Sequence, residues 1–216
     1  PAPGGPPAAG GGAAGREGDA EEALGSAMED PRLTPADYYD LCSRASLNCW
    51  AFEWVRPKPP RLSNCCLVPT IGGMGLLGSR LADLGAEAVV SVGSGAALVE
   101  WLLAARFEVV ACVDSFYEAA SDGSVSGWVV PQVRDAVAAS WRGGAEAGGD
   151  PLRFVRQGDL PGLRAAVGAR AAALLLCWPQ LQPADVAAYA AALGAPARLC
   201  GLVMVAGENC SPRDPA

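Results

Sequence analysis

The sequence contains no histidine among its 216 residues. Histidine is the usual general base near neutral pH, the usual partner of a nucleophilic Ser or Cys, and a common zinc ligand. Its absence excludes Ser-His and Cys-His nucleophilic pairs, His-dependent acid–base catalysis and His-bound metals. Chemistry in this protein must come from other side chains, or from a cofactor that carries its own reactivity.

Positive charge is also scarce, with 16 Lys and Arg against 23 Asp and Glu and a formal net charge of -7 at pH 7. Binding to duplex nucleic acid releases counterions from the phosphates and requires a surface rich in Lys and Arg. We therefore expect no duplex nucleic acid partner.

Long hydrophobic runs are missing, although 51% of the residues are hydrophobic. Gly, Pro or a charge interrupts every apolar run before it reaches the roughly 20 residues that a spanning helix needs. The first residues are Pro, Ala and Gly, without the apolar region of a secretory signal. We expect no membrane partner and an intracellular location, cytoplasmic by default, with an organellar one left open.

None of the eight cysteines belongs to a Cys-x-x-Cys pair. Cys112 and Cys177 lie inside apolar, strand-like runs, so reduced thiols that pack as small hydrophobic side chains are the preferred interpretation. The adjacent Cys65 and Cys66 have no spacing typical of a zinc site, and no metal is predicted.

Composition divides the chain into three parts. Residues 1–30 are mostly Gly, Ala and Pro at their start, bury too little surface to order themselves, and are predicted to be a disordered tail. Residues 31–85 are predicted to form an N-terminal helical segment or lid, with a helix that begins with Thr34 as its N-cap and Pro35 as its first residue. Residues 86–216 are predicted to form the core.

Short apolar strands alternate with helices through this core. Strands are predicted at residues 88–92, 108–113, 152–156, 172–177 and 202–206, and helices at 96–105, 133–141, 160–170 and 184–193. This alternation is typical of an α/β protein with a Rossmann-like, doubly wound, mostly parallel sheet covered on both faces. Ligands of such folds bind at the carboxyl ends of the strands.

The run Gly93-Ser94-Gly95-Ala96 follows the first strand and opens a helix. Its glycines permit a tight turn and a close approach to a ligand, and the helix supplies unpaired N–H groups. Asp114 closes the second strand, about 20 residues further on, where a carboxylate can accept hydrogen bonds from ribose hydroxyls. The pattern predicts a nucleoside site, with an ordinary βα turn and a solvated Asp as the alternative.

Two further strand ends carry candidate residues. Asp159, after the third strand, could accept from the exocyclic amino group of a purine, cap the following helix, or do both. Trp178 and Pro179, after the fourth strand, offer a stacking face and a rigid carbonyl, or else a hydrophobic plug over the sheet. The predicted cofactor-binding residues are Gly93, Ser94, Gly95, Ala96, Asp114 and Asp159, and the predicted catalytic residues are Trp178 and Pro179.

These motifs resemble those of the class I S-adenosylmethionine-dependent methyltransferases. Residues 90–95 are similar to their glycine-rich motif I, and residues 110–114 to the acidic end of their second strand. The resemblance covers about residues 65–210 and is closest to a poorly characterised methyltransferase-like family, through residues 67–70, Glu100-Trp101, 174–179 and 205–208. It implies S-adenosylmethionine as cofactor and a small molecule or a protein as methyl acceptor.

The sequence departs from the resembled pattern at three positions. Ser91 stands where motif I usually carries an acidic residue, Ala97 where its third glycine falls, and Gln180 where the strand-four motif has a second proline. The resembled fold continues with two further strands, which we expect this chain to lack, leaving an open sheet edge for a protein partner. The alternatives are a catalytically inactive methyltransferase-like scaffold or subunit of a larger complex, and a nicotinamide-dependent oxidoreductase.

Overall fold

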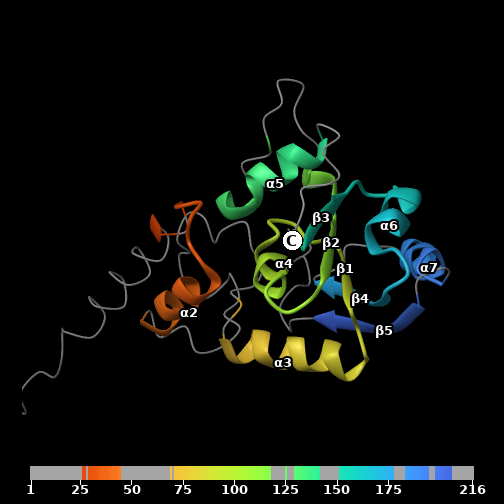
Figure 1. Ribbon diagram of the computed structural model, residues 1–216, viewed down its shortest axis with the longest axis horizontal. Helices are drawn as coiled ribbons and strands as arrows, with labels where there is room; N and C mark the ends of the chain where they lie inside the picture. Colours follow the sequence, from red (N-terminus) through yellow and green to blue (C-terminus); the bar gives the residue numbers. More distant parts are fainter. Residues whose placement is uncertain are drawn as a thin grey trace, which may run out of the picture.

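A computed structural model describes residues 26–27, 29–44, 69, 71–117, 125, 129–141, 151–177, 183–194 and 198–205. These parts of the chain form one sheet with helices on both of its faces (Figure 1). Most of the predicted tail, and residues 45–68 of the predicted lid segment, lie outside the described residues.

The sheet has five described strands, and every pairing between them is parallel. Their order is β3-β2-β1-β4-β5. From β1 the chain adds β2 and β3 on one side, then crosses back and adds β4 and β5 on the other side of β1. This order confirms the predicted Rossmann-like, doubly wound α/β fold, with its switch point between β1 and β4. The strands are β1 (Ala88–Val92), β2 (Val109–Val113), β3 (Leu152–Val155), β4 (Ala171–Cys177) and β5 (Arg198–Val205).

Central position explains the apolar character of β1 and β2. Every residue of both strands is buried, as expected for parallel strands covered on both faces. Ala88 pairs with Val109 of β2 on one side and with Ala172 of β4 on the other. Ser91 is the polar exception in β1, and it is fully buried.

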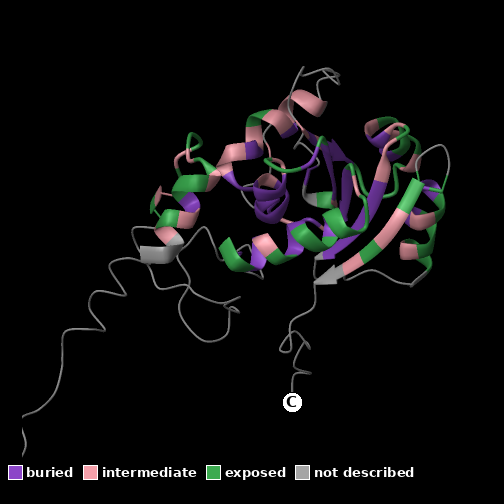
Figure 2. Cartoon of the chain, turned by 60° about the horizontal axis from the view of Figure 1, so that its bottom comes forward, coloured by how far each residue is buried: buried purple, intermediate pink, exposed green. Residues whose placement is uncertain are grey.

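The helices form two layers. Side chains from α2, α3, α4 and α5 pack on one face of the sheet against Val89 and Val110, and side chains from α6 and α7 pack on the other against Val90 and Ala111. Figure 2 shows that the central strands and α4 are buried, whereas the outer helices and β5 are more exposed. The helices are α2 (Pro35–Arg44), α3 (Ile71–Asp83), α4 (Leu98–Leu103), α5 (Pro131–Trp141), α6 (Leu160–Val167) and α7 (Pro183–Ala192), with a short 3-10 helix η2 (Ser115–Tyr117).

The start of α2 agrees with its sequence signal. The Asp37 N–H donates to Thr34 Oγ1 at 3.2 Å, and the Thr34 N–H donates to the Asp37 carboxylate at 3.1 Å. The hydrogen bonds from Thr34, first from its side chain and then from its backbone, lower the pKa of Asp37. Tyr38 is fully buried, and its ring meets that of Trp101 edge-on at 6.3 Å, which attaches α2 to α4.

Several predicted element boundaries differ from the structure; the helix predicted at 160–170, for example, ends at Val167. The helix predicted at 96–105 is only Leu98–Leu103, because Ala97 adopts a left-handed backbone conformation with φ of 62° and cannot be part of it. The fifth strand begins at Arg198 rather than at residue 202. Gly201, a poor strand former, is accommodated there because Leu84 fills the space beside it, with Cδ1 2.7 Å from where a Cβ would lie.

No described helix combines the length and the apolar character that crossing a membrane requires.

Candidate functional site

A tight loop, residues 93–97, joins β1 to α4 and is called here the glycine loop. Gly93, Gly95 and Ala97 have φ of 77°, 55° and 62°. Glycine adopts this left-handed conformation freely, whereas for Ala97 it costs roughly 1 kcal/mol. The Gly93 N–H bonds to the Val113 carbonyl at 2.9 Å, and the Ala97 N–H to the Ser94 carbonyl at 3.0 Å, so hydrogen bonds hold the turn in this shape.

The glycines of this loop have no described side chain or backbone packed against them. A Cβ built on Gly93 or Gly95 would meet no described atom within 4 Å. Gly85, at the other end of β1, is equally open, so the space permits a ligand without identifying one. Backbone without side chains at the carboxyl end of the central strand is nevertheless the feature that a close-approaching ligand needs.

The structure brings Asp114 to the glycine loop, as the sequence predicted for a joint site. The Gly95 N–H donates to Asp114 Oδ2 at 2.8 Å, across the adjacent ends of β1 and β2. The Ser115 hydroxyl donates to Oδ1 at 3.3 Å. A carboxylate oxygen can accept more than one hydrogen bond, so these two contacts do not exclude further bonds from the hydroxyls of a ribose.

The Ser94 side chain is buried and points toward the interior of the protein. Its hydroxyl shares a hydrogen bond of 2.6 Å with the Tyr117 hydroxyl, and the Tyr117 ring packs edge-on against Phe154 at 5.0 Å. Burial, with smaller contributions from Cys112 and Glu100, raises the pKa of Tyr117 well above 10, so this hydroxyl stays neutral. Ser94 thereby fastens the glycine loop to β3, and its backbone is the part left for a ligand.

A buried acid that the sequence did not single out as a site residue lies beside this loop. Glu100 in α4 is 1% exposed, and its Oε1 accepts a hydrogen bond from the Ser91 hydroxyl. Its Oε2 has no hydrogen-bond partner in the part of the chain that the structure describes. Burial raises the pKa of Glu100 to about 7, and the Ser91 hydrogen bond opposes that rise. One signal was available: Glu100 is the single polar residue in the six-residue α4.

Asp159 is the N-cap of α6. Its Oδ1 accepts from the Gly162 N–H at 2.9 Å, which confirms the capping role predicted for it. It follows β3, which lies two places from β1 in the sheet. Contact with a purine stays a prediction.

Trp178 and Pro179, the predicted catalytic residues, lie outside the described residues, as does Gln180. They follow Cys177, the last residue of β4. Leu176 of β4 pairs with Val92 of β1, so the ends of these two strands lie side by side. The structure therefore places Cys177, the last described residue before them, at the same end of the sheet as the glycine loop.

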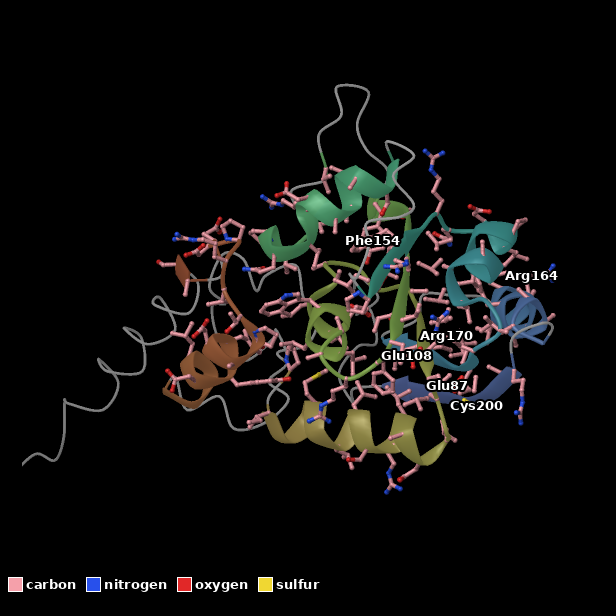
Figure 3. The ribbon with its side chains drawn as sticks, viewed as in Figure 1. Glu87, Glu108, Phe154, Arg164, Arg170 and Cys200 are labelled. Carbon is pink, nitrogen blue, oxygen red and sulfur yellow. The ribbon has the colours of Figure 1, made fainter. Side chains whose placement is uncertain are left out.

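Charged residues lie at the amino ends of the strands, at the end of the sheet opposite the glycine loop (Figure 3). Arg170 bonds to Glu108 at 3.1 Å, and the Ala171 N–H donates to Glu87 at 2.9 Å. These exposed contacts join the segments that lead into β1, β2 and β4. Within the described ranges, no three His, Cys, Asp or Glu side chains group closely enough to hold a metal ion.

Fold and site together define a Rossmann-like α/β protein with polar groups at the carboxyl ends of its neighbouring strands β1 and β2. A scan against models of known protein families finds no match for this chain, and a search of curated proteins finds none either.

Proposed function

We propose that the protein is an S-adenosylmethionine-dependent methyltransferase whose methyl acceptor is a small molecule or a protein. One observation carries the proposal: the Gly95 N–H bonds to Asp114 at 2.8 Å across the ends of the two central strands, beneath open space at Gly93 and Gly95. Partly exposed glycine backbone next to a carboxylate, at the carboxyl ends of the central strands of a doubly wound sheet, suits a nucleoside with a polar tail.

The residues present fit this cofactor in chemical terms. The glycine loop is proposed to offer backbone groups to the amino-acid end and Asp114 to bind the ribose, and Asp159, which follows β3, is proposed to contact the adenine. Trp178 and Pro179 are proposed to shape the acceptor pocket. When bound, the cofactor supplies an already activated methyl group. The protein's contribution is then to position the reactants and exclude water, for which histidine is unnecessary.

Titration calorimetry with S-adenosylhomocysteine tests this proposal through a matched pair of variants. Gly95→Ala and Gly85→Ala each place a methyl group at a left-handed, open position, φ 55° and 73°. Each should lose roughly 1 kcal/mol of stability. We expect only Gly95→Ala to weaken the ligand, by about tenfold or more.

Absence of heat with wild-type protein at about 1 mM ligand would overturn the proposal. A fluorescence change on addition of NADH, with no response to S-adenosylhomocysteine, would favour the nicotinamide-dependent alternative instead.

A catalytically inactive scaffold or subunit is the second candidate, and one observation favours it. The Asp114 carboxylate and the Ser94 hydroxyl already bond to groups of the chain itself, so the site is braced without a ligand. If Asp114→Ala abolished a measured methyl transfer while the protein stayed folded, the scaffold hypothesis would be refuted.

A further inference from the structure

Glu100 is an acid inside an apolar layer. It lies on α4 between Val99 and Trp101, and 1% of it is exposed. An unpaired carboxylate in such surroundings is destabilising by several kcal/mol unless it takes up a proton or meets a cation. One of its oxygens is stabilised by Ser91, and the other has no partner among the described residues.

Among the described residues, the groups that face Glu100 provide no positive charge. Ser91 comes from β1, and Asp114 and Tyr117 come from the segment after β2. Cys112 of β2 pairs with Ser91 in the sheet. Asp114 repels the carboxylate and so contributes to its raised pKa.

Two of the described arginines on neighbouring elements contact other groups. Arg134 of α5 donates to the Val129 carbonyl at 3.0 Å, and Arg80 of α3 lies 3.9 Å from Asp83. Arg106, which follows α4, extends over Gly78 of α3. No arginine is among the causes of the pKa shift of Glu100.

The carboxyl lies next to the proposed cofactor site. Its partner Ser91 is two residues before Gly93, and its charge is coupled to that of Asp114. A ligand must displace the covering atoms to reach it, and Gly93 and Gly95, where an added Cβ would meet no described atom within 4 Å, are the points from which it would approach.

We propose that Glu100 is the cation-binding group of this site, and that it accepts the ammonium of an amine-bearing ligand in exchange for a proton. The proton leaves the carboxyl for solvent, the ammonium keeps its own protons, and an N–H···O hydrogen bond to the carboxylate forms. The inference rests on the proposed function and assigns a specific role within it to a residue that motif comparison does not reach.

Proton release follows from the protonation state of Glu100 in the protein without ligand. With a pKa of about 7, Glu100 is roughly half protonated at neutral pH. A bound ammonium stabilises the charged form and lowers that pKa, so binding at pH 7 releases about half a proton.

Calorimetry at pH 7 in phosphate and in Tris, whose ionisation enthalpies differ, measures this release. The probes are S-adenosylhomocysteine, which carries an ammonium, and methylthioadenosine, the same nucleoside thioether without one. We expect release with the first probe only. Glu100→Gln should abolish the release and weaken S-adenosylhomocysteine about tenfold, with methylthioadenosine unaffected. Glu108→Gln, at an exposed glutamate, is the matched control and should behave as wild type.

The outcomes separate this inference from the function on which it rests. Binding of both probes without proton release, or equal weakening of both by Glu100→Gln, would overturn the role of Glu100 and leave the cofactor site standing. Failure of wild-type protein to bind either probe would overturn both. The release measurement uses wild-type protein, so it decides the matter even if Glu100→Gln does not fold.

Discussion

At the scale of single residues, Glu100 links protein stability to pH. Its pKa is about 7 in the folded protein, against an ordinary value of 4.5, and burial is the main cause. Between these two values the folded state therefore binds more protons than the unfolded state. Stability must fall as the pH rises through this window, and the full loss is reached above the folded pKa.

The variant Glu100→Gln should remove this dependence. We expect wild-type protein to lose up to about 3 kcal/mol of unfolding free energy between pH 5 and pH 8 through this group, because each pKa unit corresponds to about 1.4 kcal/mol. The amide cannot ionise, so the difference between variant and wild type should grow in favour of the variant as the pH rises. Urea unfolding across this range measures it, and parallel curves for the two proteins would contradict the buried, titrating carboxyl.

The Tyr117 hydroxyl supports the glycine loop, so its removal should affect both stability and binding. Tyr117→Phe leaves Ser94 with its 3.4 Å contact to the Val113 carbonyl and should lower the unfolding free energy by about 1 kcal/mol. Tyr189→Phe is the matched control, since it deletes the acceptor of the 2.9 Å hydrogen bond from the Gly158 N–H.

Both variants should unfold at lower urea concentration, and Tyr117→Phe alone should weaken S-adenosylhomocysteine. Equal affinity in the two variants would show that Ser94 does not need Tyr117 to hold the loop.

Some site residues were predictable from sequence because their signals are local. A glycine after a buried strand and an acid at the end of the next strand are readable without coordinates, and the bond between Gly95 and Asp114 confirms that these two positions meet. The pair Ser91 and Glu100 was not predictable, because it depends on how α4 packs over β1. A six-residue helix shows too little periodicity to reveal which of its faces is buried.

At the scale of elements, capping determines where helices begin. Strand positions were predicted well because buried parallel strands are continuous apolar runs, and β1 has the predicted bounds. Helix α4 was predicted too long because its sequence gives no sign that Ala97 takes up φ of 62°. The glycine loop takes this conformation where it packs against the segment before α5, and there the Ala96 carbonyl accepts from the Val130 N–H at 2.9 Å.

The cap of α6 can be separated from any contact of Asp159 with a ligand. Asp159→Ala should lose about 1 kcal/mol of unfolding free energy, whereas Asp159→Ser should retain most of it because a hydroxyl also accepts from the Gly162 N–H. If Asp159 also contacts adenine, both variants should weaken S-adenosylhomocysteine, since serine is too short to reach the base. Urea unfolding and calorimetry on the two proteins test this, and wild-type affinity in Asp159→Ser would limit Asp159 to capping.

At the scale of the whole molecule, the sheet is buried unevenly. Strands β1 and β2 are buried throughout, whereas β5 pairs only with β4 among the described strands and leaves Leu199 37% and Leu202 49% exposed. An edge with exposed leucines is the kind of surface that a further strand or a partner covers. The interaction predicted for an open sheet edge stays a prediction.

Hydrogen exchange should follow this order of burial. We expect the amides of β1, β2 and β4, which have described neighbours on both sides, to exchange slowest and near the free energy of global unfolding. Amides of β5 should exchange faster, through local opening of the edge. Mass spectrometry of peptides from the exchanged protein measures this, and β5 protection equal to that of β1 would indicate that another segment or a second protein pairs with it.

The segment that leads into α5 contacts two distant parts of the chain. The Val130 N–H donates to the Ala96 carbonyl in the glycine loop at 2.9 Å, and two residues later the Gln132 side chain donates to the Asp30 carbonyl, just before α2, at 2.8 Å. We therefore expect a displacement of the loop to be transmitted to the N-terminal segment through residues 130–132. A spectroscopic label on α2 would report ligand arrival at the loop, although the two lie some sixty residues apart in sequence.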